Sequence, residues 1–554
     1  MTAGDVGPRY RVFLLLALVG CSSTSEQSSV SSLSVTPHAV TIAPGAVATF
    51  LATASYSDGS SKTIAEVQWE SSAPSVATID SHGTAVGVSA GTTMIRARFM
   101  GFADSTTLSV SNSGPPRLGP LHVSTDNPRY FADPTGRVVY LTGSHYWKNL
   151  QDNGPSNPPG QFNNATYLDF LQSHNHNFTR LWVWEQARWS SETSSDHYFS
   201  PTLYVRTGPG TALDGGAKFD LNQINPAYLT RLRQRVIDAG SRSIYVSVML
   251  FDGWSVETKP GYALRNPWLA HPFNGSNNVN GVNGDPNGDA SGREIQTLAI
   301  PAVTALQDSY VRAVVDAVND LDNVMYEISN ESDPSANAWQ YHMISLIRSY
   351  EATKPKQHPI GMTISWPNGA NSDLTRSSAD WISVNGDITS PSVATGTKVS
   401  MLDTDHICGI CGDAAWVWKS LARGHNPIFM DGYDGSAGVG DPVYNPSDPK
   451  WEVIRKNLGY ARSFALRMDL ARAVPHGELA GTGYCLAAVG SEYLVFLPTG
   501  GSTTIDLTGV NGSRSLEWFD PSTNRSVSGG TVAGGTTVTI TTPFGGAAVA
   551  YIHP

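Results

Sequence analysis

Long apolar runs, basic residues and cysteines are scarce in this chain of 554 residues. Beyond the N-terminus, no segment is apolar enough to cross a membrane. Lysine and arginine number 36 against 47 acidic residues, so the net charge is −11 and there is no basic stripe for a nucleic-acid partner. Charged residues make up only 15% of the chain, whereas Gly, Pro and Trp number 53, 34 and 14, a composition typical of extracellular proteins. A chain of this length holds about two to four domains.

The four cysteines predict neither a redox centre nor a zinc site. Cys408 and Cys411 have the spacing of a redox pair, but no βαβ pattern of the thioredoxin type surrounds them. Zinc would need two further ligands, and only His406 is near in the sequence. We therefore expect either a structural disulfide across this short loop or two buried thiols.

One loop, at residues 285–292, has oxygen ligands at alternate positions, as calcium loops do. It lacks the glycine at the sixth position and the bidentate glutamate at the twelfth position of an EF-hand. A plain turn is the favoured interpretation and calcium is the alternative. No organic cofactor and no other metal are expected.

The N-terminus has the form of a secretory signal. Two arginines precede the apolar stretch 12–19, which is too short to span a bilayer. The tetrapeptide Leu18-Val19-Gly20-Cys21 resembles a bacterial lipobox, and this resemblance implies that Cys21 is lipidated and becomes the mature N-terminus. The alternative is an ordinary signal peptide that is cut elsewhere. We expect a signal peptide over residues 1–20, a polar tether over residues 21–30, and a lipid anchor in a bacterial cell envelope, at the outer membrane or the cell surface.

Residues 31–112 have the pattern of a separate small β-domain. Short alternating runs are separated by Pro-Gly, Asp-Gly and Ala-Gly turns. The runs Val67–Asp80 and Gly83–Thr92 resemble the bacterial Ig-like domain of group 2. The resemblance implies a β-sandwich that serves as a spacer or adhesion module and has no catalytic residues. A linker rich in Gly and Pro follows over residues 113–120.

Between residues 121 and 475, apolar strand candidates alternate with longer helical stretches. Eight strands with helical crossovers predict a (β/α)8 barrel, the TIM barrel. A doubly wound sheet is the alternative, but it would normally have a Gly-rich phosphate turn after its first strand, and Gly143-Ser144-His145 is not one. The predicted strands are Val138–Thr142, Phe178–Trp184, Ile244–Leu250, Val324–Ile328, Ile360–Ser365, Trp381–Asn385, Lys398–Leu402 and Pro427–Met430, and the predicted helices include Pro226–Ala239, Val303–Asp320, Ala336–Ala352 and Ala414–Arg423.

From residue 476 to residue 554 the alternation returns to period two, with Gly-rich turns between several of the runs. This pattern predicts a small C-terminal antiparallel β-sandwich. The segment Glu517–Thr523 resembles a β-module known as a collagen-binding domain, which in the resembling proteins follows a sugar-hydrolase barrel. The chain is therefore expected to be multidomain, with a barrel flanked by an N-terminal Ig-like β-sandwich and a C-terminal β-sandwich.

The most informative stretch is Ser329-Asn330-Glu331-Ser332, directly after the buried-strand pattern Val324–Ile328. In a (β/α)8 barrel the carboxyl ends of the strands form the rim of the active site. A carboxyl beside an amide suits a group that protonates a leaving oxygen while a sugar hydroxyl is held, and the alternative is an N-terminal cap of the next helix. Further polar and aromatic residues at the strand ends are expected to bind substrate, namely His145, Trp147, Arg180, Trp184, Glu185, Asp252, Trp254, Trp366, Asn385, His406, Asp431 and Tyr433.

Two elements of this set resemble the retaining glycoside hydrolases of clan A, in particular the apiosidase-like and cellulase-like barrels. They are Asn177-Phe178-Thr179-Arg180 on the second predicted strand and Asn330-Glu331 after the fourth. The resemblance implies that Glu331 is the acid/base. It also implies that Asn330 contacts the 2-hydroxyl of the substrate and that Arg180 is a partner of the nucleophile.

The seventh predicted strand departs from this clan, which has a glutamate nucleophile there. Here the strand leads into Asp403-Thr404-Asp405, and strand alternation places the two aspartates on one face. Because aspartate is one methylene shorter, the carboxyl pair could exceed the ~5.5 Å of a retaining site and approach the ~6.5–9.5 Å of an inverting one. Asp403 and Asp405 are the expected catalytic partners of Glu331, Asp431 is a third candidate, and the stereochemical outcome stays open.

These patterns together predict a secreted, lipid-anchored glycoside hydrolase that cleaves O-glycosidic bonds of a poly- or oligosaccharide with two carboxylates and no cofactor. The alternative is a non-catalytic surface adhesin, a barrel that binds glycan or host matrix through a degenerate site. The aspartates at strand seven and the two flanking β-modules support that alternative. A lyase or esterase is less favoured, because no Ser-centred elbow is evident.

Overall fold

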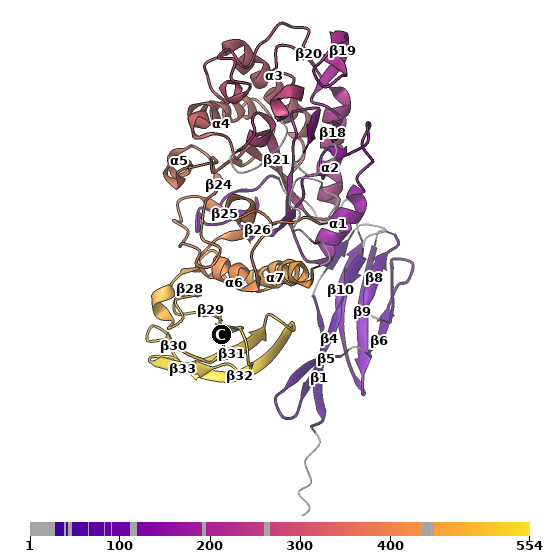
Figure 1. Cartoon of the computed structure of the whole chain (residues 1–554). Helices are drawn as coiled ribbons and strands as arrows, with labels where there is room; N and C mark the ends of the chain where they lie inside the picture. Colours follow the sequence, from indigo (N-terminus) through magenta and orange to yellow (C-terminus); the bar gives the residue numbers. More distant parts are fainter. Residues whose placement is uncertain are drawn as a thin grey trace, which may run out of the picture.

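The structure is a computed structural model in which three bodies follow one another along the chain (Figure 1). It describes residues 28–37, 40–42, 47–64, 66–81, 83–89, 91–110, 119–190, 196–259, 266–433, 445 and 448–554. The predicted signal peptide and Cys21 lie outside these residues, as do most of the predicted tether and linker.

The N-terminal body is a β-sandwich built from short strands with alternating burial. In β9, for example, Thr93, Ile95 and Ala97 face inward and their neighbours face solvent. The sheets have the strand orders β1-β4-β5, β2-β10-β9-β6 and β3-β8-β7. This part of the predicted fold is confirmed. The strands are β1 (Val30–Thr36), β2 (Val40–Ile42), β3 (Val47–Thr49), β4 (Leu51–Tyr56), β5 (Ser61–Ile64), β6 (Gln68–Ser71), β7 (Ala77–Ile79), β8 (Thr84–Gly87), β9 (Gly91–Phe99) and β10 (Phe102–Val110).

The central body is a parallel eight-stranded barrel with the order β14-β26-β25-β24-β23-β22-β21-β16. Its two end strands meet where the Asn177 amide donates to the Thr142 carbonyl at 3.0 Å. All seven residues of β22 are buried, because the helices cover one face of a barrel strand and packed side chains cover the other. The strands are β14 (Gly143–His145), β16 (Phe178–Leu181), β21 (Tyr245–Asp252), β22 (Val324–Asn330), β23 (Ile360–Thr363), β24 (Trp381–Ser383), β25 (Val399–Asp403) and β26 (Asn426–Met430).

The predicted first barrel strand, Val138–Thr142, is wrong. Val138 and Val139 form β13 (Val138–Val139) of a small antiparallel sheet with β12 (Phe131–Ala132) and β11 (His122–Val123). The chain joins the barrel only at Gly143, where a Cβ would lie 2.2 Å from the Phe178 carbonyl oxygen. A glycine thus permits the close approach that closes the barrel.

Helices surround the barrel, and their termini follow ordinary capping rules. In α2, the Asn225 side chain accepts from the Ala227 amide at 3.0 Å and Pro226 occupies the first turn. The connection between β24 and β25 has no helix, although every residue between these strands is described. The four predicted helices match α2, α3, α4 and α6 to within two residues at each end. The helices are α1 (Asn164–Ser173), α2 (Pro226–Ser241), α3 (Pro301–Val318), α4 (Asn337–Glu351), α5 (Asn371–Arg376), α6 (Ala414–Ala422) and α7 (Pro449–Ala465).

Long loops after the first barrel strands carry extra structure. The strands β15 (Asp152–Gly154), β17 (Arg188–Ser190) and β18 (Asp196–Ser200) form one small sheet, and β19 (Tyr204–Thr211) and β20 (Ala217–Ile224) form a hairpin. Short 3-10 helices shape the other loops. They are η1 (Gly253–Ser255), η2 (Pro267–Ala270), η3 (Arg293–Gln296), η4 (Pro334–Ala336), η5 (Thr404–His406) and η6 (Gly477–Leu479).

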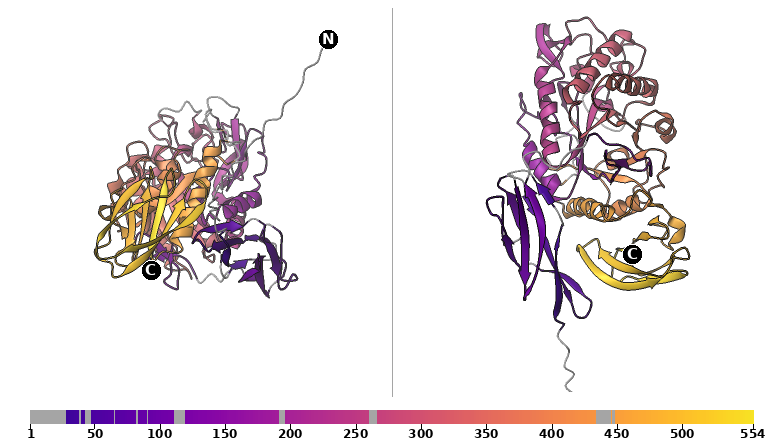
Figure 2. Two further views of the ribbon diagram at one scale, coloured as in Figure 1. Left: turned by 90° about the horizontal axis from the view of Figure 1, so that it is seen from below. Right: turned by 180° about the vertical axis from the view of Figure 1, so that it is seen from behind.

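The C-terminal body is an antiparallel β-structure docked on α6 and α7 (Figure 2). Phe519 packs against Trp418 and Phe464, with ring centroids 5.7 and 5.1 Å apart. These aromatic contacts join the domain to the barrel. Its sheets have the orders β27-β28-β29-β34-β31-β32 and β30-β33. The strands are β27 (Val474–Pro475), β28 (Cys485–Ala488), β29 (Glu492–Leu497), β30 (Ser502–Asp506), β31 (Ser513–Asp520), β32 (Arg525–Ala533), β33 (Thr537–Thr541) and β34 (Ala548–His553).

Both β-sandwiches lie on the side of the barrel away from the β19–β20 hairpin (Figures 1 and 2). In the described part of the chain, no helix has the length and apolarity needed to span a bilayer.

Candidate active site

Arg180, on β16, is the centre of a buried polar network at the carboxyl end of the barrel. Its Nε and Nη2 donate to the two carboxylate oxygens of Glu327 at 3.0 and 2.5 Å, and Nη2 also donates to Asn330 Oδ1 at 2.8 Å. On the opposite side, Nη1 donates to Asp403 Oδ2 at 3.1 Å and to Asp405 Oδ2 at 2.9 Å. One guanidinium therefore joins strands two, four and seven of the barrel and compensates three buried acids.

Asp403 has a partner at each carboxylate oxygen. Besides the bond from Arg180, its Oδ1 accepts from His145 Nε2 at 3.0 Å and from the backbone amide of Asp405 at 3.0 Å. Burial alone would raise the pKa of Asp403, but the charges of His145 and Arg180 outweigh it and hold the pKa well below its usual range. Asp403 is thus an ionised carboxylate whose bonding capacity is used within the protein.

The Asn330 amide has a defined orientation. Its Oδ1 accepts from Arg180 and from His406 Nε2, the latter at 3.0 Å, while His406 Nδ1 lies 2.6 Å from Ser383 Oγ. Since an amide oxygen only accepts, the proton of His406 must be on Nε2. Burial lowers the pKa of His406, so the ring is neutral at ordinary pH. Asn330 Nδ2 then faces Asp252 Oδ1, 3.5 Å away.

Glu331 follows the last residue of β22 with a left-handed backbone. Its φ is 45°, a value that residues other than glycine rarely adopt and that is often found at functional sites. Two neighbours accommodate this conformation. At Gly253 a Cβ would lie 2.2 Å from the Glu331 carbonyl oxygen, and Lys259 Nζ donates to the same oxygen at 3.1 Å. The local geometry of Glu331 therefore depends on a glycine and a lysine from the loop after β21.

The Glu331 side chain is buried in surroundings that favour its protonated form. Burial is the largest cause that raises its pKa well above the usual value, and the negative charge of Asp405 is the second. The indole Nε1 of Trp254 donates to Glu331 Oε2, and this bond lowers the pKa of Glu331, as does the charge of Lys259. An acid from strand four and a carboxylate from strand seven thus influence each other across the barrel.

Trp254 and Trp366 form a partly exposed aromatic pair beside Glu331. The rings are stacked, with centroids 5.7 Å apart and planes at 18°. Lys259 ties the loop after β21 to this pair, because its Nζ donates to Glu257 at 2.9 Å and to the Trp366 carbonyl at 3.4 Å. Aromatic faces of this kind suit the apolar face of a sugar ring.

Asp252, the last residue of β21, is a second protonated acid next to this network. Glu185 Oε1 accepts from the Asp252 backbone amide at 3.0 Å, and Ser255 Oγ donates to Asp252 Oδ2 at 3.1 Å. Burial, followed by the charge of Glu185, raises the pKa of Asp252 to about 8. On the far side, Glu185 Oε2 lies 3.5 Å from His271 Nε2.

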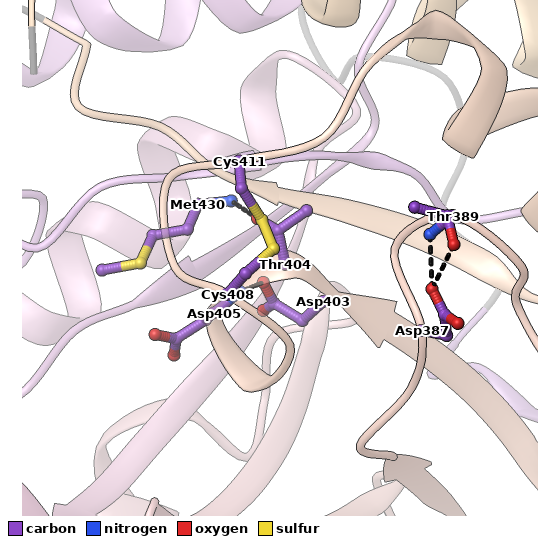
Figure 3. The surroundings of a disulfide bond; sticks show 8 residues. All are labelled: Asp387, Thr389, Asp403, Thr404, Asp405, Cys408, Cys411 and Met430. Carbon is purple, nitrogen blue, oxygen red and sulfur yellow. Dashed lines mark hydrogen bonds between the residues drawn. A yellow bond between two sulfur atoms is a disulfide. The ribbon is translucent and has the colours of Figure 1, made fainter.

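A disulfide joins Cys408 to Cys411 directly after η5, the turn that carries Asp405 (Figure 3). Of the two alternatives expected for these cysteines, the structural disulfide is therefore confirmed. Thr404 ties the same turn to the next strand, because its Oγ1 accepts from the Met430 amide at 2.9 Å. The disulfide and this bond restrict the segment that places Asp405.

Two predicted substrate-binding tryptophans lie within an aromatic core. Trp184 packs against Trp189 and Phe199, each with a ring centroid 5.1 Å away, and its Nε1 donates to the Trp147 carbonyl at 2.9 Å. Trp147 and Trp184 are only 6% and 3% exposed. These contacts favour a structural role for both residues.

Three other predicted residues make side-chain or backbone contacts outside the Arg180 network. Both carboxylate oxygens of Asp431 accept from Arg455 of α7, at 2.8 and 2.6 Å, which favours a structural ion pair. Tyr433 packs against Tyr167, with ring centroids 5.0 Å apart. Asn385 is exposed, and its backbone amide donates to the Asn371 side chain at 2.9 Å.

Sequence reasoning missed several residues of the site. Glu327 is fully buried and also accepts from Ser247 Oγ at 3.0 Å, and a carboxylate that interrupts the apolar run Val324–Ile328 is a signal for such a buried ion pair. Trp182 stacks on His145 with ring centroids 5.5 Å apart. Lys259 had no comparable signal, because its contacts depend on the fold of a long loop.

Among the described residues, one group of carboxylates could hold a metal. The ligand atoms of Asp285, Asp289 and Glu294 lie within 4.8 Å of one another. Asp285 and Asp289 belong to the loop singled out for calcium, and Glu294 follows it. Oxygen ligands of this kind suit calcium.

The N-terminal domain matches a known family. Residues 29–99 match the family described as Bacterial Ig-like domain (group 2), in agreement with the prediction. Ice-binding protein 1 of Shewanella frigidimarina (strain NCIMB 400) is 31% identical over 137 residues, which make up 24% of this chain. The chain spans only about 15% of the length of that relative.

The barrel resembles solved structures of glycoside hydrolases. A glycoside hydrolase family 5 protein from Bacteroides vulgatus ATCC 8482 aligns with a TM-score of 0.51 and 12% identity, over 78% of this chain and 92% of that one. A second structure, described as a glycoside hydrolase, aligns with a TM-score of 0.50 and 10% identity, over 78% and 97% of the two chains. At this identity the likeness shows the fold alone, a parallel eight-stranded barrel.

Proposed function

We propose that this protein is a glycoside hydrolase in which Glu331 is the general acid and Asp405 is the second carboxylate. The observation that carries the proposal is that Arg180 bonds both Asp405, on the strand-seven side, and Asn330, the residue before Glu331 on strand four. The charge of Asp405 also helps to raise the pKa of Glu331. Two carboxyls of which only one holds a proton are the requirement for acid-catalysed cleavage of an acetal.

Asp405 is a better candidate than Asp403 for the group that meets the anomeric carbon. Both oxygens of Asp403 are occupied by His145, Arg180 and backbone, whereas the bond from Arg180 engages only Oδ2 of Asp405. Asp403 then acts as a positioning residue that holds Arg180 and the backbone of Asp405.

In the proposed reaction, Glu331 gives its proton to the glycosidic oxygen as the bond from that oxygen to the anomeric carbon breaks. Oδ1 of Asp405 forms a bond to the anomeric carbon, and the leaving sugar departs with the proton. Water then attacks the same carbon, Glu331 takes a proton from it, and Asp405 is released. Two displacements retain the anomeric configuration, whereas a wider carboxyl separation would let Asp405 activate water and give inversion.

The aromatic pair of Trp254 and Trp366 supports a sugar on the leaving-group side. Trp254 donates to the proposed acid, so a ring stacked on this pair would present its glycosidic oxygen near Glu331. The amide of Asn330 supplies a donor for the neighbouring sugar hydroxyl. The substrate is a poly- or oligosaccharide.

The proposal includes a location. Lipidation of Cys21 would hold the protein at the bacterial cell envelope, and the Ig-like domain would separate the barrel from the membrane. The C-terminal domain, which resembles a collagen-binding module, would support the barrel, because its aromatic residues pack on α6 and α7.

The test is hydrolysis of a polysaccharide panel by the wild-type protein and by Glu331→Gln, Asp405→Asn and Asp403→Asn. We expect sugar release by the wild type and losses of about a hundredfold or more for Glu331→Gln and Asp405→Asn. NMR of the first anomer released distinguishes retention from inversion. Binding of glycan without sugar release by the wild type or any variant would favour a glycan-binding adhesin over the hydrolase. Full activity of Glu331→Gln would refute Glu331 as the acid.

A further inference from the structure

A hollow lies outside the Arg180 network, on the flank of the barrel at α2. We call it the α2 hollow. It has a volume of about 580 Å³, and its lining includes Asp152, Phe162, Thr230, Arg231, Gln234 and Arg235. Since a barrel helix begins after the carboxyl end of the preceding strand, the first turns of α2 lie at the same end of the barrel as Glu331.

The two arginines of the α2 hollow differ in their partners. Arg231 Nη1 donates to Asp152 Oδ2 at 2.6 Å and to the Ser200 carbonyl at 3.0 Å. Arg235 follows one turn later and is only partly exposed. In the part of the chain that the structure describes, its Nε is buried without a hydrogen-bond partner.

The charge of Arg235 is therefore poorly compensated. Burial, followed by the charge of Arg231, lowers the pKa of Arg235 to about 10, and the charges of Asp152 and Asp238 only partly oppose this. The guanidinium stays ionised at neutral pH. A desolvated cation is costly unless an anion or several acceptors meet it.

The remaining lining has one aromatic ring, which also packs against Tyr146 and Tyr167, and two uncharged polar side chains. Phe162 offers a ring, while Thr230 and Gln234 offer hydroxyl and amide groups. Because Arg231 pairs with Asp152, Arg235 leaves this concave surface with one excess positive charge on a chain of net charge −11, and that charge favours an anion.

We propose that the α2 hollow binds the anionic substituent of a sugar, either the carboxylate of a uronic acid or a sulfate ester, through Arg235. The anion site itself is inferred from the hollow and from the buried Nε of Arg235, and does not depend on the proposed function. The further assignment, that the bound anion belongs to an outlying part of the substrate, rests on the proposed glycoside hydrolase function. With that assignment, the substrates are acidic glycans.

The experiment measures binding by calorimetry in the full chain carrying Glu331→Gln, so that no probe is consumed. The probes are trigalacturonate, a sulfated disaccharide and neutral xylotriose. Arg235→Gln removes the charge, and Arg233→Gln on the same helix is the matched control, because Arg233 pairs with Asp320 away from the hollow. Thermal melts of both variants verify folding.

We expect at least one anionic probe to bind, with affinity about tenfold or more weaker in Arg235→Gln, unchanged in Arg233→Gln and reduced by salt. Preference for trigalacturonate or for the sulfated probe identifies the anion. Equal affinities of Arg235→Gln and the parent, or binding of xylotriose alone, would overturn the site. A separate turnover assay of the wild type on the same probes and on the polysaccharide panel tests the hydrolase, because anion binding that depends on Arg235 without turnover of any substrate refutes only the proposed function.

Discussion

Replacing Trp254 by phenylalanine removes one hydrogen bond from the proposed acid while an aromatic ring stays in place. In the structure, Trp254 Nε1 donates to Glu331 Oε2, and this bond favours the ionised carboxylate. Without it the pKa of Glu331 should rise. Because a general acid must hold its proton, the variant should stay active to higher pH than the wild type.

The size of the shift follows from the bond. A hydrogen bond to a charged group contributes about 1.5–3 kcal/mol, and one pKa unit corresponds to about 1.4 kcal/mol. Water that replaces the indole would recover part of this contribution. We therefore expect the alkaline limb of the kcat/KM profile to move upward by about one pH unit.

The assay is a pH profile of kcat/KM for Trp254→Phe and for Trp366→Phe. The second variant changes the other ring of the aromatic pair and leaves the bond between Trp254 and Glu331 in place, so its alkaline limb should not move. An unchanged limb in Trp254→Phe would refute the assignment of Glu331 as the acid. A shift of the acidic limb would instead make Glu331 a base.

Three further predictions concern stability. Asp252 has a pKa of about 8, so the folded state binds its proton more tightly than the unfolded state does. As pH rises from ~4 to ~8, the free energy of unfolding of the wild type should therefore fall relative to that of Asp252→Asn by up to about 1.4 kcal/mol per pH unit, and then level off. A difference in melting temperature between the two proteins that does not change with pH would contradict this. Arg180→Met should lower the free energy of unfolding in urea by about 3–5 kcal/mol and abolish activity, since buried carboxylates lose their cation, and a stable variant would show that the network is unnecessary. Cys408→Ser should cost about 2 kcal/mol or less because the disulfide closes a short loop, and the wild type in reductant should then melt at the same temperature as the variant.

The division into three bodies could be predicted because periodicity is a local property of the chain. Alternation of period two towards both ends of the chain, and apolar runs between helical stretches in the middle, agree with the observed β-sandwich, barrel and antiparallel β-structure. The first barrel strand could not be placed in this way. Val138–Thr142 is apolar enough for the barrel or for the small antiparallel sheet before it. Its first two residues pair with Phe131 and Ala132 in that small sheet.

The candidate site also contains some residues that the sequence could identify and others that it could not. Glu331, Asn330 and Arg180 were identifiable because they stand at or near strand ends, and in a barrel those ends converge. Trp184 and Asp431 also stand at strand ends, yet their contacts point to packing and to an ion pair with α7. Position along a strand does not reveal whether a side chain meets the cavity or a neighbouring helix.

By itself, the amino-acid sequence determined most of the strands and helices of the barrel, because these depend on residues a few positions apart, but it did not place the first barrel strand. It also determined which acids stand at or near the ends of the barrel strands. Only the tertiary structure decided that Arg180 holds Asp403 and Asp405 together, that Lys259 supports the backbone of Glu331, and that the Nε of Arg235 lacks an acceptor in the described part of the chain. These are contacts between residues tens to hundreds of positions apart, and burial and charge at such distances are set by packing rather than by local pattern.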